Sequence, residues 1–218
     1  KARNTDVVLV DTAVQWSFFG QAVILCMIQL GGLGFMTVIT LISFALHRRI
    51  GLSERLVMVS TFNLNDLDGV VRVVRHALIG TFAMETAGAV LMSVCLIPEF
   101  GFLKGTWHAV FHAVSSFCNA GFDILGMGAS LVPLNSDPII ILTISALIIL
   151  GGLGFGVLVD IIKVRRFSRF SLHTKVVLVC TGVLLLGGFL LFYVAEISNS
   201  KTLGGMPVGD GVMNAFFH

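Results

Sequence analysis

The residues with the clearest capacity for chemistry fall in one stretch, 108–122. His108 and His112 lie one helical turn apart, a spacing that suits a bound metal ion as well as simple packing. No carboxylate or thiol accompanies them at ligand spacing, so we interpret the pair as packing or helix-end residues. Ser115 and Ser116, near His112, are candidate nucleophiles for a hydrolase, but no Gly-x-Ser-Gly elbow supports that activity.

The end of this stretch, Cys118-Asn119-Ala120-Gly121, offers a different chemistry. Glycine adopts the left-handed backbone conformation readily, which lets successive carbonyl oxygens point the same way. Rings of such oxygens replace the hydration shell of K⁺ in channel filters. From position alone, Gly121 serves equally well as a turn residue that caps a short helix. Asn119 is either a filter residue or a polar group at the helix end, and we favour the filter.

Glu85 is the remaining candidate, because it lies inside an apolar stretch where an ionisable group is costly. It is either an ion site or a packing and hydrogen-bonding residue. The sequence identifies no partner for it, and we favour the packing and hydrogen-bonding role.

The elements that position these residues follow from composition. Of the 218 residues, 56% are hydrophobic and only 12% are charged, whereas soluble domains carry roughly 25% charged residues. A chain of this size cannot bury that much apolar surface in water, so we expect lipid to be its solvent. The formal net charge of +2 is too small to indicate a nucleic-acid partner.

A membrane helix needs about 20 mainly apolar residues. Four stretches meet this need, and the predicted spans are Gly20–Leu46, Val70–Ile97, Pro138–Ile162 and Lys175–Ala195. A further apolar stretch, Thr106–Phe122, is too short for a clear assignment from length alone.

The distribution of charge decides how this short stretch sits. Ten of the fourteen Lys and Arg residues lie in two loops, 47–76 and 163–175. The positive-inside rule places both loops in the cytoplasm. Two crossings already connect them, so a third crossing would put one basic loop outside. We therefore predict that residues 105–123 form a re-entrant pore hairpin that enters and leaves from the external side. The arginines Arg165, Arg166 and Arg169 could also dock a regulatory subunit or anionic lipid, but topology alone explains them.

An internal repeat organises the chain. Leu30-Gly31-Gly32-Leu33-Gly34-Phe35 recurs as Leu150-Gly151-Gly152-Leu153-Gly154-Phe155, in both cases in the middle of a predicted span. We interpret these glycines as sites of close helix packing, which would also let each span lie against the pore hairpin. The tail, residues 213–218, resembles residues 107–112. Both repeats keep one orientation, which is typical of a ring around a pore rather than of inverted-repeat carriers.

The fold class predicted is therefore an all-α membrane protein, in which units of transmembrane helix, re-entrant pore helix and loop, and transmembrane helix surround a central pore. Both ends of the chain look cut, so we interpret the chain as a fragment. The expected parts are residues 1–50 (the end of a first pore loop and the second helix of unit 1), 51–69 (a cytoplasmic linker), 70–163 (a complete unit 2), 164–174 (a basic cytoplasmic linker) and 175–218 (the first helix and the start of the pore helix of unit 3).

Three separated motifs resemble the KtrB-type potassium uptake subunits of the Trk/Ktr/HKT superfamily. They are residues 28–37 around the first Leu-Gly-Gly-Leu-Gly-Phe, residues 111–122 of the hairpin, and Phe170-Ser171-Leu172-His173-Thr174-Lys175. The resemblance covers essentially the whole chain in collinear order.

The resemblance implies K⁺ transport, without chemical catalysis or a cofactor, across a bacterial cell membrane, with Na⁺ as a candidate coupling ion. It implies that Cys118, Asn119, Ala120 and Gly121 form the filter quarter of unit 2, with Gly121 as the key residue. It also implies a homodimer that binds a KtrA-like cytoplasmic ring of nucleotide-binding regulatory subunits. The alternatives from other classes are an intramembrane enzyme with a re-entrant loop, for which Ser115 would be the nucleophile, and another ion-coupled solute carrier.

One departure concerns the first filter quarter. Val8-Leu9-Val10-Asp11-Thr12 matches a family segment that follows a filter glycine, yet Asp6 stands where that glycine is expected. Either the first residues are not native or the first filter is abnormal, so we assign no filter residue there.

Overall fold

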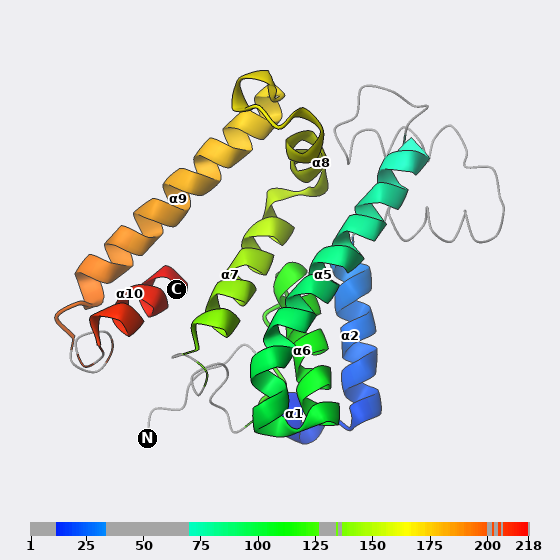
Figure 1. Ribbon diagram of the computed structural model, residues 1–218, viewed down its shortest axis with the longest axis vertical. Helices are drawn as coiled ribbons and strands as arrows, with labels where there is room; N and C mark the ends of the chain where they lie inside the picture. The colour runs from blue at the N-terminus through cyan, green and yellow to red at the C-terminus, as the bar shows by residue number, and fades with distance from the viewer. Residues whose placement is uncertain are drawn as a thin grey trace.

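The computed structural model describes residues 12–33, 70–126, 134, 137–199, 202, 205 and 207–217. Regular structure within these ranges is helical, as the fold class predicts (Figure 1). The elements are α1 (Thr12–Gln15), α2 (Phe18–Gly32), α5 (Val70–Phe100), α6 (Phe102–Phe117), α7 (Pro138–Leu153), α8 (Phe155–Val164), the short 3₁₀ helix η2 (Phe167–Arg169), α9 (Leu172–Glu196) and α10 (Val208–Phe217).

The long helices alternate in direction. In Figure 1, α2 and α7 run upward while α5 and α9 run downward, so the α8–α9 turn with its basic residues lies at the top. The side chains of Arg165, Arg166 and Arg169 in that turn are exposed. The basic residues Arg48, Arg49 and Arg55 lie outside the described residues.

Helix α6 is the short helix of the predicted hairpin. It starts at the bottom of Figure 1, directly after α5, and α7 also starts in the lower half of the view. The 16 residues of α6 give a length of about 24 Å, which is less than the ~30 Å of a hydrocarbon core. A helix too short to cross fits the predicted hairpin 105–123, which stays a prediction; the helix itself begins at Phe102 and ends at Phe117.

Two described helices are long and apolar enough to cross a membrane, Arg75–Phe100 and Leu172–Glu196. The predicted span Pro138–Ile162 consists of two helices, α7 and α8, which together are long and apolar enough to cross a membrane. α7 and α8 meet at Gly154 with a bend of 97°. Gly154 has φ of +82°, which an α-helix cannot accommodate, so the second Leu-Gly-Gly-Leu-Gly-Phe copy ends a helix instead of lying in the middle of one.

Several helix starts have side-chain caps. Asp137 precedes α7, and its Oδ1 accepts a hydrogen bond of 2.9 Å from the Ile139 backbone N–H. Pro138 then occupies the first helical position, where no backbone donor is needed. Ser171 caps α9 by accepting from the Thr174 N–H, and the Ser171 N–H itself donates to Asp160 of α8 at 3.0 Å. These caps join the bent pair to the next span.

The core is centred on α6. One face of α6 packs against α5 and α7, and this cluster includes Met92 and Ile140. The opposite face packs against α2 and the returning loop through Phe111, which is fully buried. α6 is thus covered by protein on both faces.

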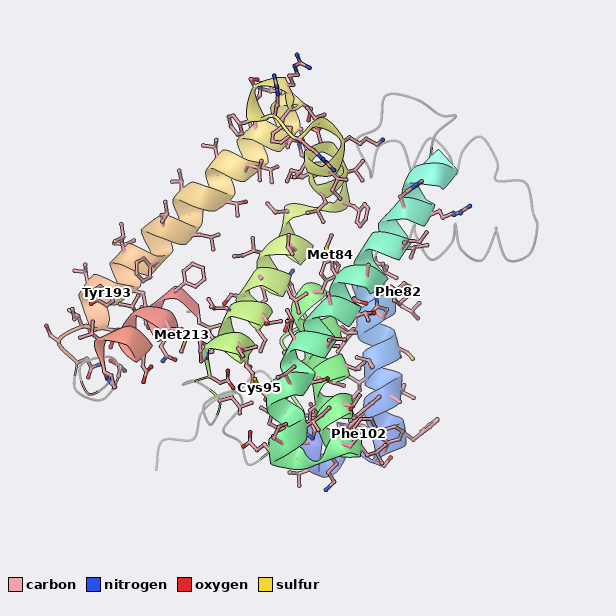
Figure 2. All side chains as sticks on the ribbon, in the orientation of Figure 1. Phe82, Met84, Cys95, Phe102, Tyr193 and Met213 are labelled. Carbon is pink, nitrogen blue, oxygen red and sulfur yellow. The ribbon has the colours of Figure 1, made fainter. Side chains whose placement is uncertain are left out.

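Much apolar surface stays uncovered by the described elements. Figure 2 shows side chains projecting along α9, with Tyr193 near its lower end and Met213 on the neighbouring α10. Leu184 and Leu191 of α9 are about three-quarters exposed, at 74% and 76%. Apolar patches of this extent require lipid or an apolar partner.

Candidate functional site

The C-terminal end of α6 is closed by a Schellman cap. The Asn119 N–H donates to the Ser116 carbonyl at 3.1 Å, and the Ala120 N–H donates to the Ser115 carbonyl at 2.8 Å. Asn119 has φ of +53°, the left-handed conformation that this motif requires. Asn119, and not Gly121, is therefore the left-handed residue that caps α6. Gly121 lies two residues further along the chain.

Gly121 makes a second left-handed turn, with φ of +71°. A Cβ atom placed on Gly121 would meet nothing within 4 Å. The glycine is thus required by backbone conformation and not by lack of space.

The loop after Gly121 is held to the helix by a side chain. The Ser115 hydroxyl, 2% exposed, donates a hydrogen bond of 2.7 Å to the Phe122 carbonyl. Asp123 then accepts from the Leu125 backbone N–H at 3.0 Å. The hydroxyl of the candidate nucleophile Ser115 therefore links the end of α6 to the loop that follows it.

The four predicted site residues, Cys118 to Gly121, lie consecutively in this turn. Within the described part of the chain, no hydrogen bond is directed to their backbone carbonyl oxygens. Asn119 and Gly121 line a cavity of about 300 Å³ together with Asp123 of the loop and Phe217 of α10. The turn after α6 and the end of α10 thus face one cavity, whose lining is mainly apolar but includes Asn119 and Asp123.

Both repeat copies contact the hairpin through glycine. A Cβ on Gly32 of α2 would lie 2.5 Å from the Cβ of Cys118, and a Cβ on Gly151 of α7 would collide with the Phe117 carbonyl oxygen. The expectation that these glycines let each helix lie against the pore hairpin is confirmed. The C-terminal end of α6 therefore lies between the backbones of α2 and α7.

Glu85 of α5 has the partner that the sequence could not identify. Its side chain is 4% exposed, and its Oε1 accepts a hydrogen bond of 3.0 Å from Gln29 Nε2 of α2. The same oxygen lies 3.9 Å from the Cys118 sulfur, which donates a weak hydrogen bond. The hydrogen-bonding role is therefore confirmed.

The two histidines are packed by stacking. His108 stacks on Phe100 with ring centroids 5.0 Å apart, and its ring lies nearly parallel to that of His112. His112 Nδ1 lies 2.7 Å from the His108 carbonyl oxygen, so this nitrogen is the N–H donor. His112 Nε2 is buried without a partner. Among the described residues no cluster of three potential ligands could hold a metal ion.

Sequence reasoning named residues 118–121 as the candidate site but did not predict that Ser115 holds the loop after it or that Gln29 binds Glu85. Both are ordinary polar residues whose partners are distant in sequence or lie across the turn, so spacing carries no signal of them. Asp6 lies outside the described residues.

A prediction follows for Ser115. Replacing Ser115 by Ala leaves the partly buried Phe122 carbonyl without its donor, and we expect the free energy of unfolding to fall by about 1–3 kcal/mol. The measurement is thermal unfolding of the detergent-purified full-length protein. Ser116→Ala is the matched control, because the Ser116 hydroxyl makes no hydrogen bond to the described residues. Equal stability of the two variants would contradict the assignment.

The chain resembles known proteins that transport cations. A family model described as TrkH, cation transport protein, matches residues 3–218. The chain is 42% identical over 213 residues to the potassium/sodium uptake protein NtpJ of Enterococcus hirae. It is 40% identical to the Ktr system potassium uptake protein B of Bacillus subtilis and 32% identical to that of Vibrio alginolyticus, over 215 residues each.

These three alignments cover 98% of this chain and 47% of each relative. The chain therefore spans about half the length of the curated relatives that it matches. All three relatives are named for ion uptake and none for catalysis.

Proposed function

Because this chain belongs to the TrkH family of cation transport proteins, a family of membrane transporters and not of enzymes, we propose that residues 118–121 form one quarter of a K⁺ selectivity filter. One observation carries the proposal. Two left-handed residues, Asn119 and Gly121, turn the chain directly after a short helix, and the backbone carbonyls of residues 118–121 accept no hydrogen bond from the described residues. Carbonyls without a protein donor are available to an ion.

The electrostatics of the hairpin favour a cation. The C-terminal end of a helix carries partial negative charge, and α6 ends at Phe117, immediately before the proposed filter. Asp123 lines the same cavity as Gly121 and would raise the local concentration of cations. In this proposal, backbone oxygens offset the cost of removing water from K⁺, and equivalent loops of other units supply the remaining oxygens.

The proposal includes a location and partners. The protein would lie in the bacterial cell membrane, with loops 47–76 and 163–175 in the cytoplasm. It would form a homodimer on a KtrA-like ring of nucleotide-binding regulatory subunits, with Na⁺ as a candidate coupling ion. The word "system" in the names of two relatives supports a multi-component assembly. The uncovered apolar surface of α9 supports contact with lipid or with further units.

The test is rubidium uptake by potassium-starved bacteria that lack their own uptake systems. Cells that express the full reading frame around this segment are expected to accumulate rubidium, with little competition from Na⁺. Cells that carry an empty vector supply the control. Absence of uptake despite confirmed membrane expression, with a regulatory subunit supplied, would contradict the proposal.

A further inference from the structure

Cys118, the first residue of the turn, is held between two helices. On one side, the backbone of Gly32 in α2 approaches so closely that a Cβ there would lie 2.5 Å from Cys118 Cβ. On another side, Glu85 of α5 receives the thiol hydrogen bond at 3.9 Å. The residue after Cys118 is the left-handed Asn119, so any shift of Cys118 is passed directly to the turn.

The same α2 helix also holds Glu85. Gln29 lies one turn before Gly32 on α2 and donates to Glu85 Oε1 at 3.0 Å. One carboxyl oxygen of Glu85 therefore accepts hydrogen bonds from Gln29 of α2 and from Cys118 of the turn. Since α2, α5 and the end of α6 meet at this oxygen, removing it loosens three elements at once.

We propose that Glu85 is a positioning residue for the filter loop: by accepting hydrogen bonds from Gln29 and Cys118 it fixes the turn at Asn119 and thereby the spacing of the loop carbonyls. This inference rests on the proposed function for its consequence, ion selectivity. The contact itself is independent of that function.

The location of Glu85 excludes a role as an ion ligand in the proposed path. Glu85 lines a separate cavity of about 430 Å³, which lies on the α2 side of α6 and includes Val110 and Val114. The cavity beside Gly121 lies on the other side of α6 and shares no lining residue with it. Glu85 can therefore act on the ion path only through the loop.

Two substitutions separate hydrogen-bond acceptance from charge. Glu85→Gln keeps the size of the side chain and its carbonyl oxygen, whereas Glu85→Leu removes the acceptor. Ser93→Ala is the matched control, because Ser93 lies on the same helix, lines the same cavity and bonds only to its own helix, at Ala89. Each variant is made in the full-length protein.

Two readouts are measured for each variant. The first is the preference for rubidium over Na⁺ in uptake, and the second is the rate at which N-ethylmaleimide alkylates Cys118, followed by mass spectrometry of its peptide. We expect Glu85→Leu to reduce the ion preference about three- to tenfold, the range set by losing the hydrogen bond from Cys118, and to increase the alkylation rate. Glu85→Gln and Ser93→Ala should resemble the native protein in both readouts.

If Glu85→Leu does not fold, Cys118→Ala removes the other partner of the same contact and is expected to lower the ion preference in the same direction. If Cys118 in a folded Glu85→Leu protein is alkylated at the same rate as in the native protein, the proposal is overturned. Equal damage from Glu85→Gln and Glu85→Leu would also overturn it, because charge would then be the active property. Faster alkylation in a protein that takes up no rubidium even in its native form would uphold the contact and reject the proposed function.

Discussion

A Gly151→Ala variant is expected to lose its native fold or to be destabilised by about 3 kcal/mol or more, a value at the upper end for an overpacked core. The added Cβ would collide with the carbonyl oxygen of Phe117. Neither group can move easily, because Gly151 belongs to the backbone of α7 and Phe117 is the last residue of α6. The two helices would have to separate at the point where the hairpin turns.

The neighbouring glycine supplies the matched control. A Cβ on Gly152 has its nearest neighbour, Asn119 Nδ2, at 3.9 Å, an ordinary contact. Alanine is preferred over glycine in a helix by roughly 0.5–1 kcal/mol, so Gly152→Ala should be neutral or slightly stabilising. Membrane expression and thermal unfolding of the two purified full-length variants test the pair. Similar stability of both would mean that α7 does not lie against the end of α6 as described.

The hairpin could be predicted from sequence because it follows from counting the membrane crossings between the two basic loops. Apolar length defined the crossings, and the basic loops left an even number of crossings between them, so residues 105–123 had to return to the side they came from. Such reasoning needs no knowledge of side-chain contacts. It succeeded for α5 and α9, which are long and apolar enough to cross a membrane.

The bend at Gly154 could not be predicted in the same way. Apolar residues continue through Phe155 and Val157, so the hydropathy of the sequence predicts a single span. A glycine in a helix and a glycine with positive φ look alike in sequence, and tertiary contacts select between them. Here Phe155 packs beside Gly80 of α5, where a Cβ would lie 2.9 Å from its ring.

The supports of the candidate site were also beyond sequence reasoning. Glu85 was recognised as a costly residue, yet its partner Gln29 is 56 positions away. Asn119 carries the helix cap that glycine usually provides, and this frees Gly121 for a second turn. Residue type suggested the candidate site, whereas the separate roles of Asn119 and Gly121 are evident only in the structure.

The Gly121→Ser variant is expected to retain its fold and to lose about tenfold of its preference for rubidium over Na⁺. Serine meets no steric obstacle here, since nothing lies within 4 Å of the added Cβ. The cost comes from the backbone, because φ of +71° is unfavourable for a residue with a side chain by roughly 1–2 kcal/mol. If the loop relieves this strain by changing φ, the carbonyls of the proposed filter turn away, and about 1.4 kcal/mol of lost discrimination corresponds to a factor of ten.

Gly101→Ser separates an effect on the filter from one on stability. Gly101 has φ of +82° and equally open surroundings, but it lies at the corner between α5 and α6, a full helix length from the loop. Both variants should therefore lose similar stability, and only Gly121→Ser should alter the competition between Na⁺ and rubidium in uptake by potassium-starved cells. Unchanged selectivity in Gly121→Ser would remove Gly121 from the ion path, whereas an equal change in both variants would trace selectivity to general loosening of the hairpin. A difference confined to Gly121 would assign ion discrimination to the conformation of this one turn.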